Sequence, residues 1–307
     1  FFAFFNSVTP TILNKASSFQ YCPLGFKAVA KWHHQPLFSK NSGCEYFNYR
    51  RHYNETSNDH FCIDLRDLCD FSEFHVAHST NIPLDQLSKR LFELPPPFEN
   101  GLTTFGSKEQ LIIARSVLTS HGWNIEKETV FDRKSVSFVE AAPEIGHVSR
   151  PIWKANDFLV EVLDGSWGLK LKQQCEAGVA LDIGCGAGRD AVHMALAFGP
   201  KWTVTGIDNH RGALERMESL AKKECVNVNA LHVDVRSAAG FAEVCGLRAD
   251  LVHACRFLDR RVLREAVGQM LRRGGLLVWT TFLQGSGRVR PGRSMAPGEI
   301  RRVTSRG

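Results

Sequence analysis

The sequence predicts an α/β protein of two domains: a small parallel-sheet domain, then a larger, Rossmann-like doubly wound one. The chain has 307 residues, and domains hold roughly 100–200 residues, which suggests two. Short apolar stretches alternate with amphipathic ones, as in parallel sheets covered by helices. A glycine-rich turn, Gly184-Cys185-Gly186-Ala187-Gly188, follows one apolar stretch and precedes a helix, as at the ligand sites of doubly wound folds.

The small domain is expected over residues 59–142. Leucines at helical spacing predict a helix that ends at the prolines of residues 95–97, and Gly122 ends a second helix. The expected strands are Phe61–Leu65, Leu102–Phe105 and Trp123–Phe131. The expected helices are Leu84–Leu94 and Lys108–His121.

The second domain is expected over residues 153–307, after a linker of residues 143–152 that contains proline and glycine. Its expected strands are Val179–Ile183, Thr203–Ile207, Ala230–Val233, Asp250–Ala254 and Leu276–Phe282. Its expected helices are Gly188–Phe198, Arg211–Glu224 and Arg261–Leu271.

Residues 1–58 show no clear period and predict a leader or a disordered extension. They are basic and poor in acids, a composition that also resembles an organelle transit peptide. The nine cysteines of the chain form no C-x-x-C pair, and several lie in apolar runs. This pattern indicates a reducing compartment and argues against both a disulfide scaffold and a zinc site. We expect a cytoplasmic protein without a metal, with a mitochondrial location as the alternative.

The charge and apolar patterns favour a small-molecule partner. The formal net charge is +6. The excess gathers near the C-terminus at Arg288, Arg290, Arg293, Arg301, Arg302 and Arg306, against the single acid Glu299. No aromatic residues alternate with these arginines, so we interpret them as a solvated loop and do not expect nucleic-acid binding. No run of about 18 or more apolar residues is present, which excludes a helical membrane span.

The glycine turn distinguishes between three kinds of ligand. A P-loop would need a lysine followed by serine or threonine, which is absent. A dinucleotide loop would need glycine or alanine where Arg189 stands. Asp182 precedes the first glycine, and its charge would repel a pyrophosphate but attract the ammonium group of S-adenosylmethionine. The turn therefore favours S-adenosylmethionine.

Two further acids support this interpretation. Asp208 ends the strand after the glycine turn, where a carboxylate can accept hydrogen bonds from both ribose hydroxyls. Asp234 ends the next strand, where a carboxylate can accept from the adenine amine. Open α/β sheets bind ligands at the carboxyl ends of their strands. One such acid is more often a turn or cap residue, but three in register favour a cofactor site.

The segment from about Pro151 to Arg306 resembles class I S-adenosylmethionine-dependent methyltransferases of the tellurite-resistance type. The resemblance rests on Leu181-Asp182-Ile183-Gly184-Cys185-Gly186-Ala187-Gly188-Arg189-Asp190, Arg256-Phe257-Leu258-Asp259-Arg260 and Gly274-Gly275-Leu276-Leu277-Val278. It implies that Asp182, Gly184, Gly186 and Gly188 hold the methionine end, that Asp208 holds the ribose, that Asp234 and Val235 hold the adenine, and that Arg189 marks the subtype.

The resemblance also implies in-line displacement of the sulfonium methyl group by a small acceptor such as a thiol, a chalcogen oxyanion or a metabolite. Arg256 and Phe257 are the candidate acceptor-side residues, although packing and a surface ion pair would explain them equally well. The alternatives are a non-catalytic scaffold or regulatory protein, a nucleic-acid methyltransferase, and an NAD-dependent oxidoreductase, against which Arg189 and Asp182 count.

Residues from about His60 to Phe131 resemble a rhodanese-like domain. The resemblance rests on Ile63-Asp64-Leu65-Arg66-Asp67, on Phe74-His75-Val76-Ala77-His78-Ser79-Thr80-Asn81-Ile82-Pro83 and on the helix that ends in His121-Gly122. It implies that Asp64 and Arg66 brace the fold. Active members of the family carry sulfur on a cysteine after the strand that is Leu102–Phe105 here, but the chain has no cysteine between Cys69 and Cys175. We therefore expect a regulatory, structural or substrate-presenting role without sulfur transfer.

The methyltransferase resemblance also implies a seven-stranded sheet that ends in a hairpin. Residues 283–307 are rich in glycine, proline and arginine and show no strand alternation. We therefore expect a methyltransferase domain that is truncated at its C-terminal end, with the acceptor-side edge of the sheet missing.

Overall fold

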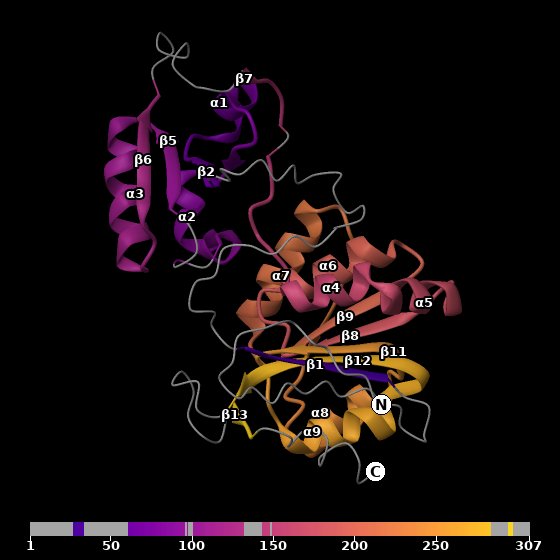
Figure 1. Cartoon of the computed structure of the whole chain (residues 1–307). Helices are drawn as coiled ribbons and strands as arrows, with labels where there is room; N and C mark the ends of the chain where they lie inside the picture. The colour runs from indigo at the N-terminus through magenta and orange to yellow at the C-terminus, as the bar shows by residue number, and fades with distance from the viewer. Residues whose placement is uncertain are drawn as a thin grey trace, which may run out of the picture. The chain divides into compact units, whose positions relative to one another are not determined.

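The computed structural model describes residues 27–33, 61–95, 97, 101–131, 143–147, 149–283 and 294–296. The chain divides into two compact units. The smaller unit spans residues 48–154, and the larger unit combines residues 1–47 with residues 155–307 (Figure 1). The arginine-rich tail and most of residues 1–58 lie outside the described residues.

The smaller unit is built on a parallel sheet in the order β4-β2-β5-β6. Its strands are β2 (Phe61–Asp64), β4 (Thr80–Asn81), β5 (Leu102–Gly106) and β6 (Ile125–Val130). Its helices are α1 (Leu68–Glu73), α2 (Leu84–Arg90) with the 3-10 turn η1 (Leu91–Glu93), and α3 (Lys108–Ser120). The three predicted strands and two predicted helices of this region are thus confirmed, while α1 and β4 were not predicted.

Residues 143–152, which were predicted to be a linker, pack instead on the smaller unit. Strand β7 (Pro143–Glu144) pairs antiparallel with β3 (His75–Val76). The Ser149 hydroxyl accepts a hydrogen bond from the Asn81 backbone N–H at 2.8 Å. Ile152 is buried in the apolar core of this unit. The boundary therefore falls after Lys154, because burying an apolar side chain favours docking over a solvated linker.

The larger unit is a doubly wound sheet in the order β1-β12-β11-β8-β9-β10. Its strands are β8 (Val179–Ile183), β9 (Thr203–Asp208), β10 (Asn229–His232), β11 (Ala249–Cys255) and β12 (Leu271–Leu283). Their pairings are all parallel. The chain builds outward from β8 through β9 and β10, then returns to add β11 on the other side of β8. The switch point between β8 and β11 is where folds of this kind bind ligands.

The outer edge of β12 carries two short strands that the sequence analysis did not predict. Strand β1 (Lys27–His33) pairs parallel with β12, from Lys27 opposite Leu276 to His33 opposite Phe282. Strand β13 (Ser294–Met295) also pairs with β12. The expectation of a leader or disordered extension does not hold for residues 27–33, and the expected open edge is covered. The physical reason is that an exposed edge strand offers unpaired backbone groups that another segment can satisfy.

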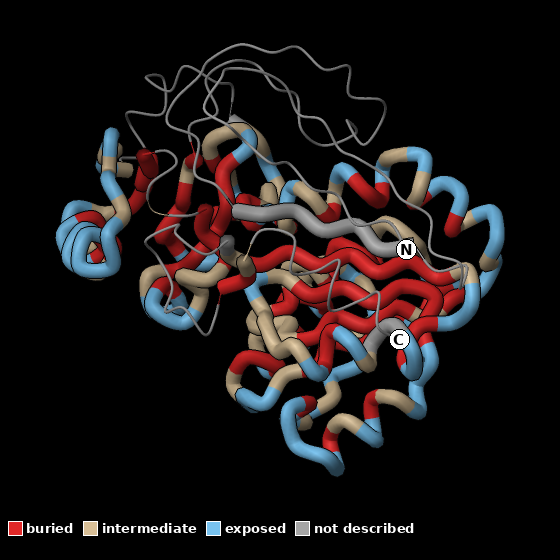
Figure 2. Tube along the Cα trace, turned by 60° about the horizontal axis from the view of Figure 1, so that its bottom comes forward, coloured by how far each residue is buried: buried red, intermediate tan, exposed pale blue. Residues whose placement is uncertain are grey.

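Helices cover both faces of this sheet. One apolar core joins it to α4 (Asp157–Asp164), α5 (Ser166–Gln174), α6 (Arg189–Phe198) and α7 (Arg211–Lys223). A second core joins it to α8 (Ala238–Cys245) and α9 (Arg260–Glu265), which continues into a π-helical turn (Ala266–Met270). Figure 2 shows the buried strands as a continuous layer between helices with exposed outer faces. None of the described helices is long and apolar enough to cross a membrane.

Candidate cofactor and acceptor site

The glycine loop between β8 and α6 has left-handed backbone at each of its three glycines. The φ angles are +70° at Gly184, +56° at Gly186 and +79° at Gly188. The Gly184 and Cys185 N–H groups both donate to the Ile207 carbonyl, at 2.8 and 3.1 Å. These bonds fasten the loop to the end of β9. A side chain at Gly188 would overlap Met217 of α7, so this glycine is required for packing as well as for its φ angle.

Beneath the loop, Asp182 of β8 is hydrogen-bonded to His253 of β11. The His253 Nδ1 and the Asp182 Oδ1 are 2.7 Å apart, and both side chains are buried. The two residues stand opposite each other in the register of the paired strands. Burial raises the pKa of the Asp182 carboxyl. Burial alone would lower the pKa of His253, but the Asp182 carboxylate, with Asp190, outweighs it and raises that pKa. Both shifts favour a proton held between the two groups.

The pair makes stability depend on pH. The pKa of His253 is raised above its ordinary value of 6.5, so its contribution is complete below about pH 6.5 and is lost as the pH rises through the folded-state pKa. We expect the free energy of unfolding to decline in urea titrations at increasing pH above about 6.5. His253→Gln should remove this part of the decline. Parallel pH curves for variant and wild type would contradict the assignment.

A second set of hydrogen bonds ties α4 to the same place. The Asn156 backbone N–H donates to Asp190 Oδ1 at 2.6 Å, and the Asn156 side-chain amide donates to the Cys255 sulfur at 3.3 Å. The Asn156 Oδ1 caps α4 by accepting from Phe158 and Leu159. One asparagine thus connects the start of α4, the start of α6 and the end of β11.

A cavity of about 740 Å³ opens at the carboxyl ends of the strands. Six predicted site residues line it: Gly184, Asp208, Asp234, Val235, Arg256 and Phe257. Asp182, Gly186, Gly188 and Arg189 are not among its lining residues. For Asp182 this differs from the expected direct contact with a ligand, because its carboxylate is buried and bonded to His253.

Asp208 and Asp234 present carboxylate oxygens whose orientation is fixed by backbone N–H groups. Asp208 Oδ2 accepts from Gly186 and Oδ1 accepts from His210, both at 2.9 Å. Asp234 Oδ1 accepts from Arg236 at 3.0 Å. An ionised carboxylate can accept about four hydrogen bonds, so both retain capacity for hydroxyl or amine donors of a ligand. No atom lies within 4 Å of where a Cβ would stand at Gly186, which leaves room beside the loop.

Phe257 forms a fixed apolar wall of the cavity. A Cβ placed on Gly184 would lie 2.8 Å from the Phe257 ring, so the ring packs closely on the glycine loop. The Trp279 ring meets it edge-on with centroids 6.0 Å apart, and the Trp279 indole N–H donates to the Phe257 carbonyl at 3.0 Å. The Arg236 guanidinium lies 4.9 Å from the ring centroid. Phe257 therefore serves both packing and the cavity, the two roles that the sequence left open.

Sequence reasoning missed several lining residues. They are Ile207, Asn209, Val233, Arg236, Cys255, Leu258 and Phe282. Each lies near the carboxyl end of a strand or up to four residues beyond it, so extending the search four residues past the strand ends would have found them. Burial raises the pKa of the Cys255 thiol, which keeps it protonated near neutral pH. Cys255 is therefore a poor nucleophile or base in this environment.

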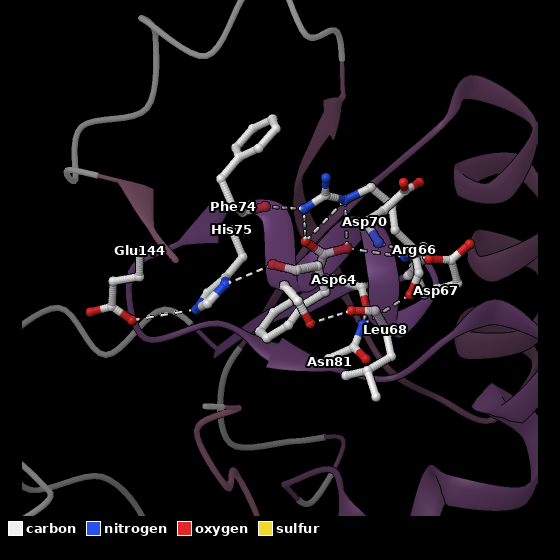
Figure 3. A network of polar contacts seen from close by, with 12 residues as sticks. Asp64, Arg66, Asp67, Leu68, Asp70, Phe74, His75, Asn81 and Glu144 are labelled. Atoms are coloured by element: carbon white, nitrogen blue, oxygen red, sulfur yellow. Dashed lines mark hydrogen bonds and ion pairs between the residues drawn. The ribbon is translucent and has the colours of Figure 1, made fainter. Parts of the chain in front are cut away.

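In the smaller unit, Asp64 and Arg66 form the predicted brace (Figure 3). The guanidinium Nε donates to Asp64 Oδ1 at 3.0 Å, its Nη2 donates to Oδ2 at 2.6 Å, and both side chains are buried. His75 lies at the edge of this network, where its Nε2 is 3.5 Å from a Glu144 oxygen. Ser107, which opens the loop after β5, caps α3 by accepting from the Gln110 N–H at 3.2 Å. This serine has a structural task.

Residues 180–275 match the sequence model of the family described as "Methyltransferase domain". This segment contains the glycine loop and strands β9, β10 and β11 with their strand-end residues. The larger unit therefore contains a segment that matches a methyltransferase domain.

The chain is also similar to individual proteins. It is 25% identical over 268 residues to "Uncharacterized protein UNK4.09" of Schizosaccharomyces pombe, covering 72% of this chain and 76% of that protein. Among solved structures it resembles TehB from Haemophilus influenzae, at 17% identity and TM-score 0.37 over 48% of this chain and 49% of that one. It also resembles CrArsM, an arsenic (III) S-adenosylmethionine methyltransferase from Chlamydomonas reinhardtii, at 25% identity and TM-score 0.35 over 42% and 50%. The chain thus spans half or less of these two structures.

Proposed function

We propose that this protein transfers the methyl group of S-adenosylmethionine to a small-molecule acceptor in the cavity of the larger unit. The observation that carries the proposal is the convergence of the glycine loop and the Asp208 and Asp234 carboxylates on one cavity within the matched domain. The family match and Arg189, which stands where a dinucleotide loop needs glycine or alanine, both favour a methyltransferase over an oxidoreductase that uses NAD.

Each cofactor residue has a proposed task. Asp208 accepts from the ribose hydroxyls, and Asp234 with the buried Val235 holds the adenine. The backbone of the loop, with Gly184, Gly186, Gly188 and Arg189, binds the methionine end. Asp182 stands two residues before the loop, and its bond to His253 fixes the end of β8 from which the loop starts.

Bound S-adenosylmethionine supplies a methyl group on a positively charged sulfur. The chain orients the partners and keeps water out. Phe257 closes the cavity beside the loop. Cys255 stays protonated and removes no proton from the acceptor. An acceptor that is a soft or already ionised nucleophile needs no base at this cysteine.

Calorimetric titration of the purified chain with S-adenosylmethionine, S-adenosylhomocysteine and NADH tests the proposal. We expect one site for the first two ligands and none for NADH. Binding of NADH without S-adenosylmethionine would overturn the proposed function.

Asp208→Ala should weaken S-adenosylhomocysteine binding by about 10- to 100-fold, because it removes charged hydrogen bonds to the ligand. It also releases the Gly186 N–H that holds the loop. Glu215→Ala is the matched control, since it removes an exposed carboxylate of α7 that pairs with Arg211 at 3.6 Å. Equal dissociation constants for the two variants would refute the role of Asp208.

For the smaller unit we propose a rhodanese-like accessory role without sulfur transfer. Two features support it: the absence of a cysteine between Cys69 and Cys175, and the cap that Ser107 provides for α3. A thiosulfate and cyanide assay should yield no thiocyanate above background. Thiocyanate production that disappears in Cys62→Ser or Cys69→Ser would contradict this proposal.

A further inference from the structure

Arg256 has an unusual backbone at the acceptor end of the cavity. It follows the last residue of β11, and its φ angle is +55°, a left-handed value that is uncommon for residues other than glycine. The Arg256 N–H donates to the Thr280 carbonyl of β12 at 2.9 Å, which holds this conformation in place. A strained residue that is held at a ligand cavity is a candidate for a functional role.

The other charged groups of the cavity are already engaged. Asp208 and Asp234 accept from backbone N–H groups and are the proposed cofactor ligands. The second cation, Arg236, lies over the Phe257 ring and 3.9 Å from Asp259 Oδ2. Arg256 differs, because its exposed side chain lines the cavity and forms no ion pair with any acid that the structure describes.

The residues next to Arg256 in the chain also line the cavity. They are Cys255, Phe257 and Leu258. A guanidinium offers a planar fork of N–H donors that matches a carboxylate or another oxyanion.

We infer that Arg256 binds an anionic group of the methyl acceptor, a carboxylate or an inorganic oxyanion. This inference rests on the proposed methyltransferase function and narrows its substrate class. An anionic acceptor fits a cavity whose cysteine stays protonated, because an anion needs no base to remove a proton. The anionic atom either receives the methyl group itself or serves as a handle that aligns another atom.

Binding of simple anions to the protein saturated with S-adenosylhomocysteine tests the inference. The probes are benzoate with its neutral analogue benzamide, and inorganic selenite, measured by calorimetry or ligand-observed NMR. We expect wild type to bind benzoate or selenite and to bind benzamide more weakly. Arg256→Gln should weaken anion binding by about 10-fold or more and leave S-adenosylhomocysteine affinity unchanged.

Two controls separate the possible causes. Arg211→Gln replaces an exposed arginine of α7 by the same residue type. This variant should bind the anions as the wild type does. Arg256→Gly relieves the left-handed strain and should still lose the anion, which separates the guanidinium from the backbone. The inference is overturned if the wild type binds neither anion, or if Arg256→Gln binds the anions as tightly as the wild type does. In either case, binding of S-adenosylhomocysteine by the wild type would still support the proposed function. If the wild type does not bind S-adenosylhomocysteine, the proposed methyltransferase function is overturned instead.

A transfer assay then distinguishes the two uses of the anion. Small molecules from a cell extract are divided on an anion-exchange resin and incubated with the protein and methyl-labelled S-adenosylmethionine. We expect labelled products only from the retained fraction. For a singly charged carboxylate, products that no longer bind the resin indicate methylation of the anionic atom, and products that still bind indicate a handle. A methylated inorganic oxyanion keeps a charge and stays bound. Label only in products of the unretained fraction would overturn the inference.

Discussion

Replacing Asp182 by Ala lowers the free energy of unfolding by about 3–5 kcal/mol, because it leaves the buried His253 imidazole without its partner. No solvent reaches His253 to compensate, since both side chains are buried. The glycine loop starts two residues after Asp182, so we expect S-adenosylhomocysteine binding to be lost as well. Urea denaturation and calorimetry measure the two effects.

Two further variants make this result specific. Asp182→Asn keeps an oxygen that can accept from His253 Nδ1 and should be milder than Asp182→Ala. Asp182→Ala combined with His253→Leu removes both polar groups and should recover much of the lost stability. A loss below about 1 kcal/mol for Asp182→Ala, typical of an exposed ion pair, would show that the pair does not support the loop.

Gly188→Ala is the second change with a large expected effect. It introduces a side chain at a left-handed position and forces it against Met217. Left-handed backbone costs about 1–2 kcal/mol for a residue with a Cβ, and overpacking adds about 1–3 kcal/mol. The expected loss of unfolding free energy is therefore about 2–5 kcal/mol, measured by urea denaturation without ligand.

Gly186→Ala provides the matched control for this change. Gly186 has a similar left-handed φ angle, but a Cβ there would meet open space. It should show only the backbone part of the loss, about 1–2 kcal/mol. Equal losses for the two variants would show that the contact with Met217 is unimportant.

Strands β8 to β12 could be predicted from sequence because each contains a short run with apolar residues. Val179–Ile183 was predicted with the bounds of β8, and the other four predictions overlap β9 to β12. The glycine loop and the acids at strand ends followed from the same pattern. Helix α4 was missed although Asn156 caps a stretch with apolar residues at helical spacing, a signal that the sequence did contain.

The features that could not be predicted depend on which strands are neighbours. Asp182 and His253 meet because β8 and β11 are adjacent in the sheet, although they are far apart in the chain. Their pairing gives the Asp182 carboxylate a partner within the protein, where the sequence predicted a ligand contact. Arg256 was a candidate from sequence, but its left-handed backbone is held by Thr280 on a different strand. Ile152 shows the same limit, since a proline-rich segment gave no sign of the core it enters.

The position of β1 makes the smaller unit an insertion within the larger one. The chain begins the large sheet with Lys27–His33, completes residues 48–154 as a separate unit, and only then supplies β8 to β12. Strand β1 therefore cannot pair until Leu276–Phe282 has been synthesised, and this segment is nearly the last part of the sheet to appear. Such a distant pairing closes a long loop and is slow to form. The smaller unit is continuous in sequence, so its folding does not depend on this late pairing. It then links the two segments of the chain that form the larger unit.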